Sequence, residues 1–166
     1  AIEARASEMT AAERLGREGK LPRRLCHCDT KVNNMLIDAV TGEVLCVIDL
    51  DTVMPSFVFS DYGDFLRTGA CTAAEDEPDV SKIDFDMDIY RAFTDGYLSE
   101  AESFLTPLER SMLPFAVRLF PYMQATRFLT DYINGDTYYK TTGPEHNLVR
   151  TRAQLALLDA IDRRLP

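Results

Sequence analysis

The stretch HCDTKVNN at residues 27–34 is followed by a short apolar region and then by IDLD at residues 48–51. Both stretches place carboxylate or amide side chains close together. The apolar runs NMLID and VLCVI lie between the two groups, and the linker that separates these runs contains Gly42, which is a turn signal. The pattern predicts a β-hairpin with a polar loop at each of its open ends.

This hairpin predicts which polar side chains meet. If its turn is centred near Thr41, Asn34 lies opposite Ile48, with the two Cα atoms roughly 4.5–5.5 Å apart. Asp49 follows Ile48 directly. The hairpin therefore brings Asn34 and Asp49 side by side, although they are far apart along the chain.

The first polar stretch has the spacing H-x-D-x-x-x-x-N, formed by His27, Asp29 and Asn34. This spacing is typical of the catalytic loop of kinases. There the carboxylate orients the attacking hydroxyl and receives its proton, and carboxylate and amide oxygens suit Mg²⁺. We therefore expect Asp29 to be the catalytic base, and Asn34 and Asp49 to hold one magnesium ion between them. Lys31 is a candidate contact for the transferred phosphate, with a solvated surface lysine as the alternative.

Three other residues are expected to support this loop. The imidazole of His27 is expected to bond nearby backbone. Asp61 and Asp64 lie in SDYGDFLR, which reads as the start of a helix, and carboxylates near a helix start can stabilise an adjacent loop.

The segments HCDTKVNNMLID, VLCVIDLD and SDYGDFLR, within residues 26–67, resemble the aminoglycoside phosphotransferase and choline kinase-like superfamily. The resemblance implies ATP and Mg²⁺ as cofactors, and it places Asp49 where the family has a metal-binding Asp. Two positions depart from the usual pattern. Cys28 stands where Gly is usual, and Thr30 stands where an apolar residue is expected.

RFLTDYINGDTYYK at residues 127–140, with HNLVRTRAQLALL after it, is similar to one branch, the N-acetylhexosamine 1-kinases. That similarity implies that Arg127 and Tyr138 contact a sugar whose anomeric hydroxyl is phosphorylated, and Asp49 is a further candidate sugar contact. Choline, homoserine and aminoglycosides are alternative acceptors. The residues themselves leave a second interpretation of Arg127 open, as a buried ion-pair partner of Asp131 one helical turn later.

The remaining sequence predicts an α+β fold that is mostly α, a small hairpin followed by helices. The resemblance to the superfamily implies that this fold is a protein-kinase-like C-terminal lobe whose hairpin carries the catalytic and metal-binding loops. The helices are expected at about residues 4–18, 60–70, 84–102, 107–133 and 145–164. Residues 1–166 read as a single lobe, because no Gly-rich phosphate loop follows a strand and no strand-borne lysine precedes residue 20. We therefore expect a fragment whose N-terminal nucleotide lobe is missing, and a non-catalytic kinase-like binding module is the alternative.

Composition restricts the partners. The 166 residues carry a formal net charge of -9, with a pI near 4.7. This balance argues against nucleic acid and against anionic lipid as partners, and no apolar run approaches the roughly 20 residues of a membrane span. The four cysteines read as reduced thiols of a cytoplasmic protein. The acidic surface suits a cationic acceptor as well as a neutral one, so net charge does not select the acceptor.

Overall fold

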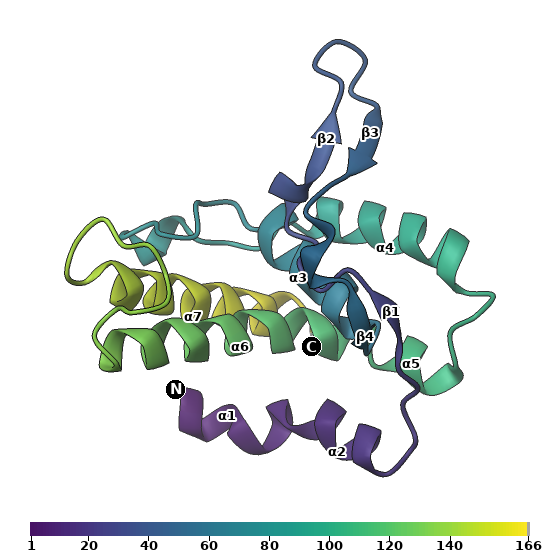
Figure 1. Cartoon of the computed structure of the whole chain (residues 1–166), viewed down its shortest axis with the longest axis horizontal. Coiled ribbons are helices and arrows are strands. Elements are labelled where there is room, and N and C mark those ends of the chain that lie inside the picture. The colour runs from purple at the N-terminus through teal and green to yellow at the C-terminus, as the bar shows by residue number, and fades with distance from the viewer. Residues whose placement is uncertain (166) are drawn as a thin grey trace.

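The computed structural model describes residues 1–165 as a mostly α-helical chain with two small antiparallel sheets (Figure 1). This confirms the expected α+β class with a predominance of helix. The helices are α1 (Ile2–Met9), α2 (Ala11–Arg17), α3 (Phe59–Gly69), α4 (Met87–Ala101), α5 (Pro107–Ser111), α6 (Leu113–Ile133) and α7 (His146–Arg164). The strands are β1 (Arg24–Cys26), β2 (Met35–Ile37), β3 (Val44–Val47) and β4 (Met54–Ser56). Three short 3₁₀ helices are η1 (Val32–Asn34), η2 (Leu50–Thr52) and η3 (Val80–Lys82).

Strands β2 and β3 form the predicted hairpin, which projects away from the helices (Figure 1). Met35 pairs with Val47, and the backbone N–H of Ile48 donates to the carbonyl of Asn34 at 2.9 Å. The predicted register is therefore confirmed. Asp49 follows at the same end of the hairpin as Asn34.

The second sheet pairs β1 with β4 and was not anticipated from the sequence. Arg24 pairs with Ser56, and Cys26 pairs with Met54. This pairing brings the loop that follows β1 next to the loop that follows the hairpin. The two polar loops are thus fixed relative to each other twice, once by each sheet.

Helices α3, α6 and α7 build the core beneath these loops, and α6 and α7 run side by side along most of their length (Figure 1). Gly63 on α3 is required for this packing, because a Cβ atom at this position would lie 2.5 Å from the Ala116 carbonyl oxygen of α6. The close approach lets α3 hold Asp61 directly against the loop of residues 27–34, the candidate catalytic loop. The fully buried apolar residues of the three helices include Tyr62, Leu66, Ala116, Val117, Leu157 and Ile161.

The segment expected as one helix at residues 107–133 is divided at Met112 into α5 and α6. Pro114 lies in the first turn of α6, where its missing N–H costs nothing. In a continuous helix its ring would clash with the carbonyl of the residue four positions earlier, so the helix is interrupted before it. Pro121, in contrast, lies inside α6, which continues through it. The expected helix at residues 4–18 is likewise divided, with its break at Thr10.

Helix α5 is tied to β1 through Glu109. Thr106 and Glu109 form a reciprocal capping box at the start of α5, which agrees with the helix expected from about residue 107. The Glu109 carboxylate also accepts two bonds from the Arg24 guanidinium, both at 2.9 Å, and its side chain is only 2% exposed. This buried ion pair fixes the strand that leads into the catalytic loop.

Apolar side chains on the hairpin face solvent. Val44 is 59% exposed and Leu45 is 62% exposed, and Val40 at the turn is 93% exposed. The hairpin thus offers an apolar surface that no other described residue covers. Within residues 1–165, none of the helices is both long and apolar enough to cross a membrane.

Candidate active site

Asp61 on α3 holds the catalytic loop by its backbone. Its carboxylate accepts the N–H of His27 at 3.0 Å and the N–H of Cys28 at 2.8 Å. The hydroxyl of Thr30 donates to the Asp61 carbonyl at 2.7 Å. The predicted loop-supporting role of Asp61 is confirmed, and the hydroxyl at position 30 has a partner that an apolar residue would lack.

Cys28 adopts a left-handed backbone conformation, with φ of 66°. Glycine adopts this conformation without a steric cost, whereas other residues pay about 1–2 kcal/mol. The usual glycine at this position of the resembled superfamily therefore has a physical reason, and Cys28 holds the same backbone at a cost. The Asp61 carboxylate supplies one of the bonds that keep it there.

His27 joins the two polar loops. Its Nδ1 accepts the N–H of Asp29 at 3.3 Å, so Nε2 carries the proton and donates to the Ile48 carbonyl at 2.9 Å. The hydroxyl of Thr52, beyond the hairpin, donates to the His27 carbonyl at 2.7 Å. The predicted structural role of this imidazole, bonding nearby backbone, is confirmed.

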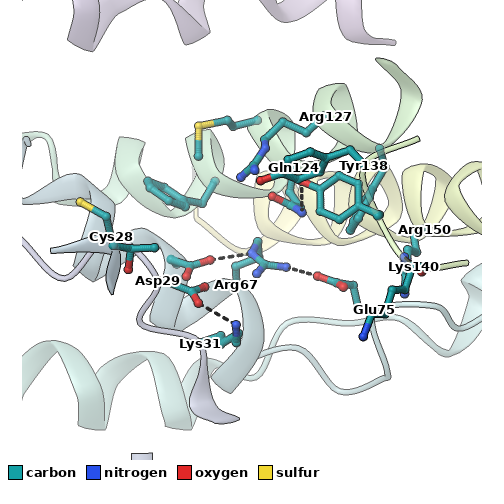
Figure 2. Close-up of a pocket in the computed structure, with 16 residues that line it drawn as sticks. Cys28, Asp29, Lys31, Arg67, Glu75, Gln124, Arg127, Tyr138, Lys140 and Arg150 are labelled. Carbon is teal, nitrogen blue, oxygen red and sulfur yellow. Dashed lines mark hydrogen bonds and ion pairs between the residues drawn. The ribbon is translucent and has the colours of Figure 1, made fainter. Parts of the chain in front are cut away.

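The Asp29 carboxylate is bonded on one side only. Its Oδ2 accepts the Lys31 ammonium at 2.6 Å and the Asn34 amide at 2.9 Å (Figure 2). Among residues 1–165, no donor bonds its Oδ1. The hydrogen bond to Asp29 raises the pKa of Lys31, so the lysine stays charged beside the carboxylate. Asp29 therefore keeps one oxygen available to accept a hydroxyl proton.

Asn34 and Asp49 present oxygen atoms at the base of the hairpin. The Nδ2 of the buried Asn34 donates to the Asp29 carbonyl at 2.8 Å as well as to its carboxylate, so Oδ1 is the atom left for another partner. Asp49 has φ of 65°, and its Oδ2 lies 4.0 Å from the Lys31 ammonium. One cationic side chain thus lies between the Asp29 and Asp49 carboxylates. Carboxylate and amide oxygens are ligand types that suit Mg²⁺. Within residues 1–165, however, no cluster of three or more His, Cys, Asp or Glu side chains is placed to hold a metal ion.

A cavity of about 430 Å³ opens beside Asp29 (Figure 2). It lies between the catalytic loop, α3, α6 and the segment after α6. Asp49 is not among its lining residues, so no contact between Asp49 and an acceptor is supported. Its acidic and basic lining residues are Asp29, Lys31, Asp64, Arg67, Glu75, Arg127, Lys140 and Arg150.

Asp64 does not support the catalytic loop in the way that its position near the start of α3 suggested. It accepts Arg67 at 2.9 Å, and the same guanidinium reaches Glu75 at 2.5 Å (Figure 2). Burial raises the pKa of Asp64, although the Arg67 charge opposes that shift. The ion pair has a sequence signal, since Asp64 and Arg67 are three positions apart on one helix. The contact to Glu75 has none, because it depends on how the acidic loop folds back.

Arg127 contacts aromatic rings and not a carboxylate. Its guanidinium lies 5.9 Å from the ring centre of Tyr138 and 5.6 Å from that of Tyr139. Asp131 is bonded elsewhere, and within residues 1–165 Arg127 forms no ion pair with any acid. The ion-pair interpretation is therefore wrong. The argument that Arg127 is buried and needs a partner is also wrong, because the side chain is exposed on α6.

The structure brings Arg127 and Tyr138 together at the end of the cavity opposite Asp29, and it adds residues that the sequence did not single out (Figure 2). Lys140 follows the aromatic pair, and Arg150 reaches the cavity from α7. Gln124 donates to the Tyr139 hydroxyl at 3.3 Å. Their positions depend on how α6, α7 and the segment between them pack, which no short motif encodes.

The geometry agrees with a comparison of the chain with known families. The model of the phosphotransferase enzyme family matches residues 1–97, which is more than half of the chain. The match includes the catalytic loop, the hairpin and α3, and it ends before Arg127 and Tyr138. The H-x-D-x-x-x-x-N loop, the half-bonded Asp29 carboxylate and the oxygen groups at the hairpin base lie within this range. The chain therefore belongs to the phosphotransferase enzyme family.

Proposed function

We propose that the chain is the catalytic lobe of an ATP- and Mg²⁺-dependent kinase that transfers the γ-phosphate to a hydroxyl of a small molecule. The acceptor we propose is a sugar, with the anomeric hydroxyl of an N-acetylhexosamine first. The observation that carries the proposal is Asp29, which lines the cavity and whose Oδ2 is held by Lys31 and Asn34 while no donor within residues 1–165 bonds its Oδ1.

Each polar residue has a proposed task in this reaction. Asp29 accepts the proton of the acceptor hydroxyl and orients the attacking oxygen. Asn34 and Asp49 would hold a magnesium ion, which would neutralise phosphate charge. Lys31 stabilises the charge of the transferred phosphate, because its ammonium already lies beside Asp29. His27 and Asp61 keep the loop backbone fixed, so Asp29 needs little reorganisation during the reaction.

The charges around the cavity favour a neutral or anionic acceptor. Five cationic and three acidic side chains line it, although the whole chain has a net charge of -9. A cationic acceptor such as choline or an aminoglycoside would meet Arg127, Lys140 and Arg150. Tyr138 and Tyr139 offer aromatic faces against which the apolar face of a sugar ring packs. This distribution supports the sugar proposal over the cationic alternatives. Homoserine is a zwitterion, so the cationic side chains disfavour it less than they disfavour choline or an aminoglycoside.

The proposed cytoplasmic kinase includes a preceding lobe that covers the ATP phosphates. The exposed apolar hairpin, with Val44 and Leu45, supports this arrangement, because a partner surface would bury it. Residues 1–166 alone then have half a nucleotide site, and we expect them to turn over no ATP. A robust ATP-dependent activity of the isolated chain would contradict the two-lobe proposal.

The first test is an acceptor screen with the full-length protein, using ATP and Mg²⁺ and measuring ADP release. We expect turnover with an N-acetylhexosamine, and Asp29→Asn to lower kcat by roughly 10²–10⁴. Asp95→Asn on the exposed face of α4 is the matched control and should keep wild-type kcat. Wild-type turnover by the Asp29 variant would remove Asp29 from the mechanism. Absence of turnover with every acceptor class would favour the non-catalytic binding module.

The second test concerns the acceptor end of the cavity. Arg127→Ala should raise the acceptor KM at least tenfold and leave the ATP KM within twofold, because only the acceptor loses a donor. Arg152→Ala, an exposed arginine on α7, is the control. An unchanged acceptor KM in the Arg127 variant would end the proposed sugar contact.

A further inference from the structure

The chain reverses direction immediately after α6. Gly135 and Asp136 both have left-handed backbones, with φ of 87° and 57°. The N–H of Gly135 donates to the Tyr132 carbonyl at 3.1 Å, and the N–H of Asp136 donates to the Asp131 carbonyl at 2.9 Å. These two bonds form a Schellman motif, which ends the helix and satisfies its last carbonyls. Backbone bonds therefore satisfy these carbonyl groups at the end of α6, and the Asp131 side chain is not needed for this.

The Asp131 side chain instead binds the backbone of the segment that follows the turn. Its Oδ1 accepts the backbone N–H of Thr137 at 3.0 Å and of Tyr138 at 2.9 Å, and its Oδ2 accepts that of Tyr139 at 3.0 Å. One carboxylate thus binds three consecutive N–H groups of residues 137–139. Bonds of this kind to an ionised acceptor are stronger than bonds between neutral groups. The backbone of residues 137–139 is held in one conformation.

A buried amide completes the arrangement. The fully buried Asn147, at the start of α7, donates to Asp131 Oδ2 at 2.9 Å and to Asp136 Oδ1 at 2.8 Å. The amide therefore joins the end of α6, the following turn and the beginning of α7. Hydrogen bonds from the backbone of residues 137–139, that of Tyr139 first, keep the pKa of Asp131 below its usual range, so the carboxylate remains ionised.

Thr137 and Tyr138 of the held segment are exposed, and only Tyr139 packs inward, with its ring centre 4.8 Å from that of the buried Phe128. Tyr138 is 74% exposed, and its ring lies against Tyr139 and the Arg127 guanidinium at the cavity end. Arg127 is one helical turn before Asp131 on the same helix. The contact of Tyr139 with Phe128 belongs to the core, whereas the bond from the Tyr138 N–H to Asp131 fixes a residue that lines the cavity.

We propose that Asp131 is a positioning residue for the acceptor: by binding three backbone N–H groups it holds Tyr138 and Tyr139 against Arg127, so that the acceptor end of the cavity exists before the acceptor arrives. This inference rests on the proposed function, because it assumes that this end of the cavity receives the acceptor. Asp131 touches no substrate itself. Preorganisation of this kind lowers the ordering cost that a ligand would otherwise bear on binding.

Hydrogen–deuterium exchange of the full-length protein tests the structural half. Asp131→Asn retains one oxygen but turns an NH₂ group towards the donors of Tyr139 or Asn147, so the amides of residues 137–139 should exchange at least tenfold faster. Asp136→Asn is the matched control: it removes the same charge, its amide oxygen can still accept the Asn147 bond, and it should leave these amides protected. Unchanged exchange in the Asp131 variant would overturn the proposal.

A double-mutant cycle with Arg127→Ala tests the functional half. Asp131→Asn alone should raise the acceptor KM about tenfold, with the ATP KM unchanged. In the Arg127→Ala background the same change should raise it less than threefold, because the two residues act through one surface. Fully additive effects, or faster exchange without a change in acceptor KM, would reduce Asp131 to a structural role and overturn the inference. If Arg127→Ala itself leaves acceptor KM unchanged, the proposed acceptor site fails, whatever the exchange experiment shows.

Discussion

Asp61→Asn tests whether α3 holds the catalytic loop in place. In the native chain one carboxylate accepts two backbone N–H groups, at 3.0 Å from His27 and at 2.8 Å from Cys28. The asparagine side chain has nearly the same volume but only one acceptor oxygen. Its NH₂ group would face one of the two N–H donors, so one bond is lost and a donor is left against a donor.

The expected magnitude follows from these two bonds. A hydrogen bond to a charged group contributes about 1.5–3 kcal/mol, and an unsatisfied buried donor costs about 1–3 kcal/mol. Since the site is only half-buried, we expect Asp61→Asn to lower the free energy of unfolding by about 2–4 kcal/mol. For a chain of this length that corresponds to a melting temperature lower by roughly 5–15 °C.

Activity should fall as well, because the lost bond releases the strained backbone of Cys28, the neighbour of Asp29. We expect kcat to drop more than tenfold in the folded variant at temperatures well below its melting point. The measurements are thermal unfolding and initial rates of the full-length protein. Asp88→Asn, whose side chain is 94% exposed, is the control and should change stability by less than about 0.5 kcal/mol. A melting temperature within 2 °C of wild type, with kcat within twofold, would refute the reasoning.

Three other predictions concern stability. Cys28→Gly should raise the free energy of unfolding by up to about 1 kcal/mol in chemical denaturation, since relief of the left-handed strain exceeds the entropic cost of glycine; Cys28→Val should lower it, and the opposite order would contradict the strain argument. Glu109→Gln should lower the free energy of unfolding by about 3 kcal/mol, because Arg24 would lose its buried partner, and a loss below about 1 kcal/mol would show that the ion pair is dispensable. The pKa of Asp131 is lowered in the folded state, so its stabilisation is present above its ordinary pKa near 4 and is lost as pH falls below that value. The melting-temperature difference between wild type and Asp131→Asn should therefore shrink between pH 6 and about pH 3, and a difference independent of pH would contradict the assignment.

The local parts of the site could be predicted from the sequence. The hairpin, its register, the start of α5 at Thr106 and the loop-supporting roles of His27 and Asp61 all follow from patterns shorter than a few dozen residues. Such patterns succeed because a turn with one glycine and two apolar runs has few registers that keep its polar ends together. The spacing of Asp29 and Asn34 is also local, and it indicated phosphoryl transfer because it is typical of the catalytic loop of kinases.

Long-range contacts decided the rest. Pairing of β1 with β4, the reach of Glu75 to Arg67, and the position of Arg150 beside the cavity join segments that are separated along the chain, and no periodicity encodes them. The sequence also left open a buried ion pair between Arg127 and Asp131. The structure does not form it, because Asp131 binds the backbone of residues 137–139 and Arg127 contacts two tyrosine rings.

The sequence by itself determined which polar groups lie together locally, because the residue types and their spacing along one loop and one hairpin place Asp29, Asn34 and Asp49 near one end of that hairpin. Only the tertiary structure decided which residues line the cavity beside Asp29. Asp131 illustrates the difference: in the sequence it is a helical acid one turn after an arginine, whereas in the fold it binds three backbone N–H groups of a returning segment. The physical reason is that a hydrogen bond requires its donor and acceptor to lie close together in space. The Asp131 carboxylate reaches these N–H groups only when α6, the chain reversal at Gly135 and α7 have packed together.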